Sequence, residues 1–187
     1  MNSSIFFNKS FRFAALASAV ALGAFGASSS FAAEAEATTT ADVITPISIT
    51  SSGTLAFGRF AANDTTVGSV IIDTASVRSK SGDVILSEAD STSSAATFVV
   101  SGDGNASFSI GLADTELSDS ETEPNTMLLA TITDFDGSGG VTTETNETVG
   151  VLTDGTQTIY VGGILSVGVD QAAGDYSGTV TATVEYN

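Results

Sequence analysis

The sequence contains no cysteine, no histidine and no tryptophan, and only two prolines and five basic residues among 187. Without cysteine no disulfide can form, so a secreted form would depend on packing or on partner chains. The chain also lacks the usual thiol nucleophile and the usual base at neutral pH. Few basic side chains remain to bind a phosphate or an oxyanion. The composition therefore argues against an enzyme, and no cofactor is expected.

Charge of one sign dominates the chain, with 22 acidic residues and a formal net charge of −17 at pH 7. A strongly negative protein is repelled by the phosphates of nucleic acids and by anionic membrane surfaces. The charge therefore predicts a soluble protein without a nucleic-acid partner.

The N-terminus has the pattern of a secretory signal peptide over residues 1–32. Lys9 and Arg12 precede an apolar run over residues 13–25, and small residues follow at Ser30 and Ala32. The run is too short to cross a bilayer stably. We expect cleavage after Ala32, with nearby alanines as alternative sites. This pattern predicts export through the Sec pathway without direct membrane insertion.

Strand patterns recur about every ten residues after the leader, separated by clusters of Gly, Asp, Asn and Ser. The predicted strands are 45–50, 54–60, 68–73, 83–86, 97–101, 106–112, 127–135, 157–161, 164–169 and 176–186. Residues 114–125 and 137–147 are predicted to be exposed loops. No stretch shows helical periodicity. The pattern predicts an all-β fold over residues 45–187, an antiparallel immunoglobulin-like β-sandwich. The sandwich is either complete or lacks one strand that a donor supplies.

The last predicted strand is amphipathic, because its apolar side chains fall on even positions. They are Tyr176, Val180, Ala182, Val184 and Tyr186, alternating with Ser, Thr and Glu. A strong strand at the edge of a sheet exposes unpaired backbone groups and invites another strand.

Residues 33–44 form an N-terminal extension with the same alternation. Ala35, Ala37, Thr39, Ala41 and Val43 share one face, and mostly acidic or threonine residues share the other. Two interpretations are open: a solvated leader, or a strand that needs a partner sheet. In a third arrangement residues 43–49 fill the missing position themselves, and the domain completes itself.

Two further patterns suggest binding chemistry. Asp134, Asp136 and Ser138 match the start of a calcium loop, but the twelfth position is Thr145 where Glu is required. The alternative is a glycine-rich turn. Arg59, Arg78 and Lys80 are expected to pair with acids on the surface, and Gly162 and Gly163 to form a turn or bulge.

Several stretches resemble a family of bacterial secreted proteins, the domain-of-unknown-function family 4402. They include ADVITPISITSSGTLAFGRF, GDVILSE, TFVVSGDGNASFSIGL, TIYVGGILSVG and AAGDYSGTVTATVEYN. This family is similar to chaperone–usher fimbrial subunits, which tend to carry a penultimate Tyr and a Gly fourteen positions from the end. Tyr186 and Gly174 match those positions. The resemblance implies a periplasmic chaperone and an outer-membrane usher as partners.

Together these features predict a structural subunit of a surface fimbria or a fimbria-like polymer. Copies would join by β-strand addition, with Ala35, Ala37, Thr39, Ala41 and Val43 in the donor. The acceptor would include Gly174, Tyr176, Val180, Val184 and Tyr186. The protein would pass through the periplasm to the cell surface. The alternative is a self-contained secreted or surface binding module of the adhesin type.

Overall fold

The computed structural model describes residues 32–140 and 148–187. Most of the predicted leader and part of the predicted 137–147 loop, including Thr145, lie outside these ranges. Residues 42–187 form one compact unit. Within the described residues no helix has the length and apolar character needed to cross a membrane.

The described part of the chain contains twelve strands, and every pairing between them is antiparallel. They are β1 (Ser48–Ser52), β2 (Phe60–Ala61), β3 (Gly68–Ile72), β4 (Arg78–Gly82), β5 (Ile85–Leu86), β6 (Ala96–Ser101), β7 (Ser107–Leu112), β8 (Thr115–Ser118), β9 (Thr126–Asp134), β10 (Val149–Val151), β11 (Thr156–Val167) and β12 (Ala182–Tyr186). The all-β, antiparallel sandwich predicted from the sequence is confirmed.

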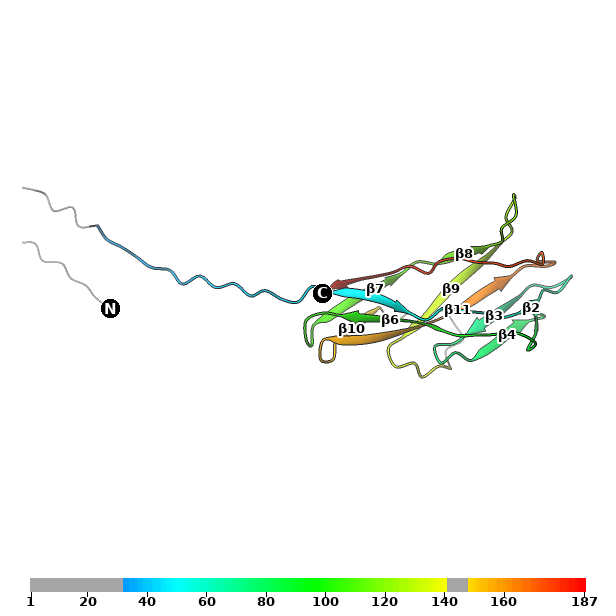
Figure 1. Ribbon diagram of the computed structural model, residues 1–187, viewed down its shortest axis with the longest axis horizontal. Helices are drawn as coiled ribbons and strands as arrows, with labels where there is room; N and C mark the ends of the chain where they lie inside the picture. The colour runs from blue at the N-terminus through cyan, green and yellow to red at the C-terminus, as the bar shows by residue number, and fades with distance from the viewer. Residues whose placement is uncertain (1–31, 141–147) are drawn as a thin grey trace, which may run out of the picture. The chain divides into compact units, whose positions relative to one another are not determined.

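The long strand β11 organises the larger sheet. Its residues 156–161 pair with β6, and its residues 163–167 pair with β3. Residues 160–165 pair with β9, so β9 occupies the opposite edge from β6 and β3. The sheet extends to β1 beyond β6, to β4 beyond β3 and to β8 beyond β9. Figure 1 shows β11 running through the middle of the domain.

The smaller sheet of the sandwich consists of β10, β7 and β12, and β2 pairs with β5 in a separate two-stranded sheet. Strand β7 belongs to the smaller sheet, whereas β8, which follows after two residues, belongs to the larger sheet. The C-terminal segment runs antiparallel first to β8 and then to β7. Ser177 bridges Ser118 beside β8, and β12 then pairs with β7. The C-terminal segment therefore joins the two sheets along one side of the sandwich.

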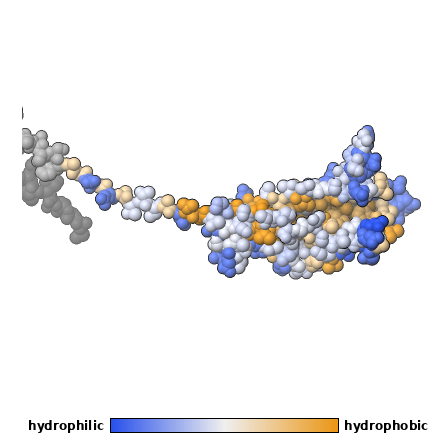
Figure 2. Space-filling view, in the orientation of Figure 1, coloured by the Kyte–Doolittle hydropathy of each residue, from blue (hydrophilic) through white to orange (hydrophobic). Residues whose placement is uncertain are grey.

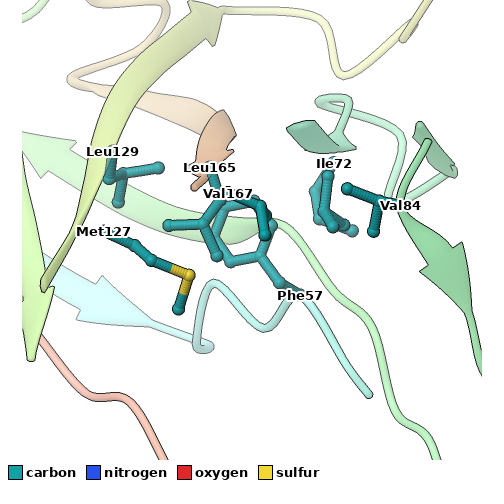
Figure 3. Packing of buried hydrophobic residues seen from close by; sticks show 8 residues of the cluster. Phe57, Ile72, Val84, Met127, Leu129, Leu165 and Val167 are labelled. Atoms are coloured by element: carbon teal, nitrogen blue, oxygen red, sulfur yellow. The ribbon is translucent and has the colours of Figure 1, made fainter. Parts of the chain in front are cut away.

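The core consists of two clusters of buried side chains. One contains Phe57, Val70, Ile72, Val84, Met127, Leu129, Leu165 and Val167, and Figure 3 shows the Phe57 ring packed among the side chains of this cluster. The other contains Ala96, Phe98, Val100, Phe108, Ile110, Leu152, Ile159 and Val161. Leu55 and Val180 contact both clusters. The two sheets therefore enclose one continuous apolar interior.

The predicted break at Gly162 and Gly163 is wrong, because both glycines lie inside β11. A Cβ atom on Gly162 would overlap the Ile72 carbonyl, and one on Gly163 would lie 2.6 Å from Leu129 Cδ1. These glycines therefore let β3 and β9 approach β11 on either side; they do not form a turn.

Other strand boundaries also differ from the sequence-based prediction. Strands β4, β8 and β10 were not predicted, and β8 lies within the predicted 114–125 loop. Residues 54–60 were predicted as a strand but form only an isolated bridge at Ala56 and the start of β2. The last strand covers 182–186 instead of 176–186, because the segment before it changes sheets. Strands β4 and β8 are mostly polar and β10 has only three residues, so none of them shows the apolar alternation on which the prediction rested.

Candidate functional site: the open edge between β1 and β12

Strand β12 lies at the edge of the smaller sheet, and among the described residues it pairs only with β7. Its even residues are half-buried and its odd residues are exposed, as the sequence predicts. The even side chains, Ala182, Val184 and Tyr186, pack against the core cluster that contains Phe108. The apolar side chains of β12 are therefore covered only in part, on the side that faces the core.

The even residues of β12 also carry the backbone N–H and C=O groups that do not pair with β7. At the two ends of the pairing, the Ala113 N–H donates to the Thr181 carbonyl (3.4 Å) and the Asn187 N–H donates to the Ser107 carbonyl (3.1 Å). Residues alternate between facing a partner and facing away in an antiparallel pair. The N–H and C=O groups of Ala182, Val184 and Tyr186 therefore face outward from the sheet.

Strand β1 forms the neighbouring edge of the larger sheet. The Gly102 N–H donates to the Gly155 carbonyl (3.0 Å), so the even residues of β6 face β11 and its odd residues face β1. The register of β1 on β6 then turns the backbone of Ile49 and Ser51 outward. The side chains of Ile47 and Ile49 are half-buried against the core.

These two flanks define what we call the open edge. It consists of Ile47, Ile49 and Leu55 on the β1 side and of Val180, Ala182, Val184 and Tyr186 on the β12 side, all partly buried against the core. Directly beneath them, Val100, Phe108 and Leu152 are fully buried. Figure 2 shows hydrophobic residues in a band along the visible face of the domain. The open edge is therefore lined by apolar side chains that lie against buried core residues.

Tyr186 closes one end of the open edge. Its hydroxyl accepts a hydrogen bond from the Asp103 N–H (2.6 Å) and donates one to the Thr45 carbonyl (2.6 Å). The hydroxyl lies over Gly102, where any Cβ atom would overlap it. Tyr186 therefore joins the C-terminus of β12, the β6–β7 turn and the chain that leads into β1.

The structure brings most of the predicted acceptor residues together on this face. Tyr176 is half-buried; its hydroxyl donates to the Ala172 carbonyl (2.9 Å) and accepts from Gln171 Nε2 (3.0 Å). Gly174 is exposed, and a Cβ atom there would meet nothing closer than 3.6 Å. Tyr176, Val180, Val184 and Tyr186 share the inner face of the C-terminal segment, but Gly174 has no packing role in the chain.

The predicted donor residues Ala35, Ala37, Thr39, Ala41 and Val43 are all exposed and lie outside any strand. Val43 is 92% exposed and Ile44 is 52% exposed. The arrangement in which residues 43–49 fill the missing position is only partly seen: residues 43–46 are exposed, whereas Ile47 and Ile49 pack against the core and β1 pairs with β6 from Ser48.

The predicted calcium positions form a hydrogen-bonded turn. Asp134 Oδ1 accepts from the Gly137 N–H (2.6 Å), and its Oδ2 accepts from Thr74 Oγ1. The Ser138 N–H donates to Asp136 Oδ1 (2.8 Å), and this bond lowers the pKa of Asp136. In the part of the chain that the structure describes, no group of three or more acidic side chains is placed to hold a metal ion. The geometry fits the glycine-rich turn.

Arg78 has a role that the sequence did not predict. Its guanidinium donates to the carbonyls of Phe57, Arg59 and Ser87 and to Ser91 Oγ, over 2.8–3.3 Å. It also pairs with Glu88 at 2.8 Å, but the Arg78 side chain is only 7% exposed. The predicted pairing with a surface acid is present for Arg78, but its guanidinium is buried and also ties backbone loops together. Lys80 similarly donates to the Val84 carbonyl (2.6 Å).

Comparison with known proteins identifies a family. A family model described as "Domain of unknown function (DUF4402)" matches residues 47–186. That range runs from just before β1 to the end of β12 and includes both flanks of the open edge. No curated protein matches the chain.

Proposed function

This chain belongs to the DUF4402 family, whose description states no activity, and we propose a function from its open edge. The protein is a structural subunit of a surface fimbria or fimbria-like polymer. Each copy accepts a β-strand from another copy along β12. Main-chain hydrogen bonds would supply the strength of each link, and alternate side chains would supply its specificity.

One observation carries this proposal: the same residues of β12 present outward backbone groups and apolar side chains. At Ala182, Val184 and Tyr186 the N–H and C=O groups face away from β7, and the side chains are only half-buried. Each hydrogen bond made there would contribute roughly 1 kcal/mol net. An incoming strand would therefore gain backbone pairing and cover apolar surface at the same time.

The N-terminal extension has the chemistry of a donor for this edge. Ala35, Ala37 and Ala41 alternate with polar residues, and all are exposed. Because the residues beneath the open edge are already buried, large side chains on the donor would find no pocket. Small side chains at alternate positions suit such a surface, and they let the two backbones approach closely.

An open apolar edge also has to be covered before assembly, since such edges aggregate. We therefore include a periplasmic chaperone that pairs with β12 in transit, and an outer-membrane usher that exchanges it for the next subunit. The assembled protein would then be located at the cell surface. The strongly acidic chain keeps assembled polymers soluble through charge repulsion.

The proposal is tested by hydrogen exchange on a variant that starts at Asp42, where the compact unit begins. A synthetic peptide spanning residues 33–44 is added in increasing amounts. The amides of Ala182 and Val184 should become protected in a dose-dependent way. The amides of Thr183 and Glu185 already face β7, so they serve as internal controls within the same strand.

A peptide carrying Thr39→Pro is the matched control, because proline removes one donor from the middle of the added strand. This peptide should protect the amides of Ala182 and Val184 less than the natural peptide does. It should also raise the melting temperature of the domain by a smaller amount. If neither peptide changes exchange at Ala182 and Val184, the open edge does not accept the extension. The self-contained binding module would then be the better description.

A further inference from the structure

The extension of a second copy has to compete for the open edge with the extension of the same molecule. The extension leads into β1 through Thr45, whose carbonyl lies at the Tyr186 end of the open edge. A tethered segment has an effective concentration in the millimolar range for a short flexible connection. At micromolar protein concentration the extension would therefore fill its own open edge first, unless the structure disfavours that reversal.

We propose that Tyr186 and Pro46 act as positioning residues that prevent this self-insertion, so that the occupant of the open edge is the extension of a second copy. This inference rests on the proposed strand donation and adds the reason why it occurs between molecules. The residues concerned all lie at the Tyr186 end of the open edge.

The Tyr186 hydroxyl supplies the first restraint. It holds the Thr45 carbonyl at 2.6 Å while the Asp103 N–H holds the hydroxyl at 2.6 Å from the other side. The hydroxyl fits there because Gly102 has no side chain. To fold back beside β1, the chain would have to reverse between Val43 and Ile47 and give up this fixed carbonyl.

Pro46 supplies the second restraint. Its ring fixes its own φ angle and removes the N–H that a tight hairpin turn could use. It also disfavours the helical region for Thr45, so the residue before it stays extended. Thr45 and Pro46 are both exposed, so neither residue is required to fill the core. Together the two restraints oppose a reversal of the chain between Val43 and Ile47.

The test uses hydrogen exchange at Ala182 and Val184 in the full chain, expressed with its own leader, over a hundredfold range of protein concentration. In the natural protein these amides should exchange rapidly when dilute and become protected only as oligomers form. In Tyr186→Phe the hydroxyl is lost, and the same amides should be protected in the dilute monomer. Light scattering should then show a midpoint of oligomer formation at least tenfold higher in concentration.

Tyr160→Phe is the matched control, because it removes a tyrosine hydroxyl from β11, which does not belong to the open edge. It should behave like the natural protein. Pro46→Gly provides a second variant at an exposed position, and its effect should have the same direction as that of Tyr186→Phe.

Each remaining outcome contradicts a different step. If the natural protein shows protection that grows with concentration and both variants match it, the restraint by Tyr186 and Pro46 is wrong, but strand donation stands. If the natural protein is protected equally at every concentration, self-insertion occurs despite both residues. If its amides stay unprotected throughout, strand donation itself is wrong, and the restraint has nothing to act on.

Discussion

Arg78 shows how one buried side chain can hold several loops. Its Nη1 and Nη2 atoms donate to three backbone carbonyls, one serine and one glutamate. The glutamate is 88% exposed, so its ion pair with Arg78 is screened by water and contributes little. The part-buried carbonyls of Phe57 and Ser87 are the partners that matter, because a buried acceptor left without a donor costs about 1–3 kcal/mol. The Arg59 carbonyl also accepts from the Ser87 N–H.

We expect Arg78→Ala to destabilise the domain by about 3 kcal/mol, since several acceptors lose their donor at once. Glu88→Gln should cost less than about 1 kcal/mol, because it removes only the exposed ion pair. Urea denaturation of both variants measures the difference. Equal losses would mean that the ion pair, and not the set of carbonyl bonds, is the stabilising interaction.

Among the elements, β11 depends on its two glycines as much as on its apolar residues. Its side chains at odd positions from Ile159 to Val167 fill the core. Gly162 lies where the end of β3 approaches β11 most closely. Any side chain at Gly162 would push the Ile72 carbonyl away. The sequence shows Gly-Gly between two β-rich stretches, which equally predicts a turn.

Gly162→Ala should destabilise the domain by about 3 kcal/mol, because backbone atoms must move to admit the methyl group. Gly104→Ala is the matched control, since a Cβ atom at Gly104 would meet nothing within 4 Å; its effect should stay within about 0.5 kcal/mol. Thermal unfolding of the two variants compares them. Similar melting temperatures would show that β3 and β11 can separate at little cost.

For the whole molecule, the main consequence of the fold is that two sheets meet along one unclosed side. The C-terminal segment pairs first with β8 and then with β7, so its unpaired edge runs along one side of the sandwich. On the opposite flank, β1 pairs only with β6 within the described residues. Assembly through this side would leave each copy's acidic outer faces in solvent.

Val184→Lys should prevent assembly without unfolding the domain. The half-buried position lets a lysine reach solvent, but its charge would then occupy the open edge. Thr183→Lys adds the same charge one residue away on the exposed face, and it should assemble normally. Light scattering of concentrated samples separates the two, and assembly of Val184→Lys would exclude β12 as the acceptor.

Short-range patterns made part of this structure predictable. Alternation in the C-terminal segment predicted which side chains of β12 face inward, and clusters of Val, Ile and Thr located most strands of the core. Strands β4 and β8 escaped prediction because they are mostly polar, and β10 because it has only three residues; all three depend on pairing with neighbouring strands. Arg78 escaped as well, since nothing in its local sequence distinguishes a buried arginine from an exposed one.

The sequence by itself determined the all-β class, the inward face of the last strand and the absence of disulfides, because these follow from residue types and from a period of two. Only the tertiary structure decided that β11 is continuous, that Tyr186 contacts Thr45, and that β1 and β12 border one open edge. Those features join residues up to 141 positions apart in the chain. Their physical cause is the pairing and packing of distant strands, which no local pattern specifies.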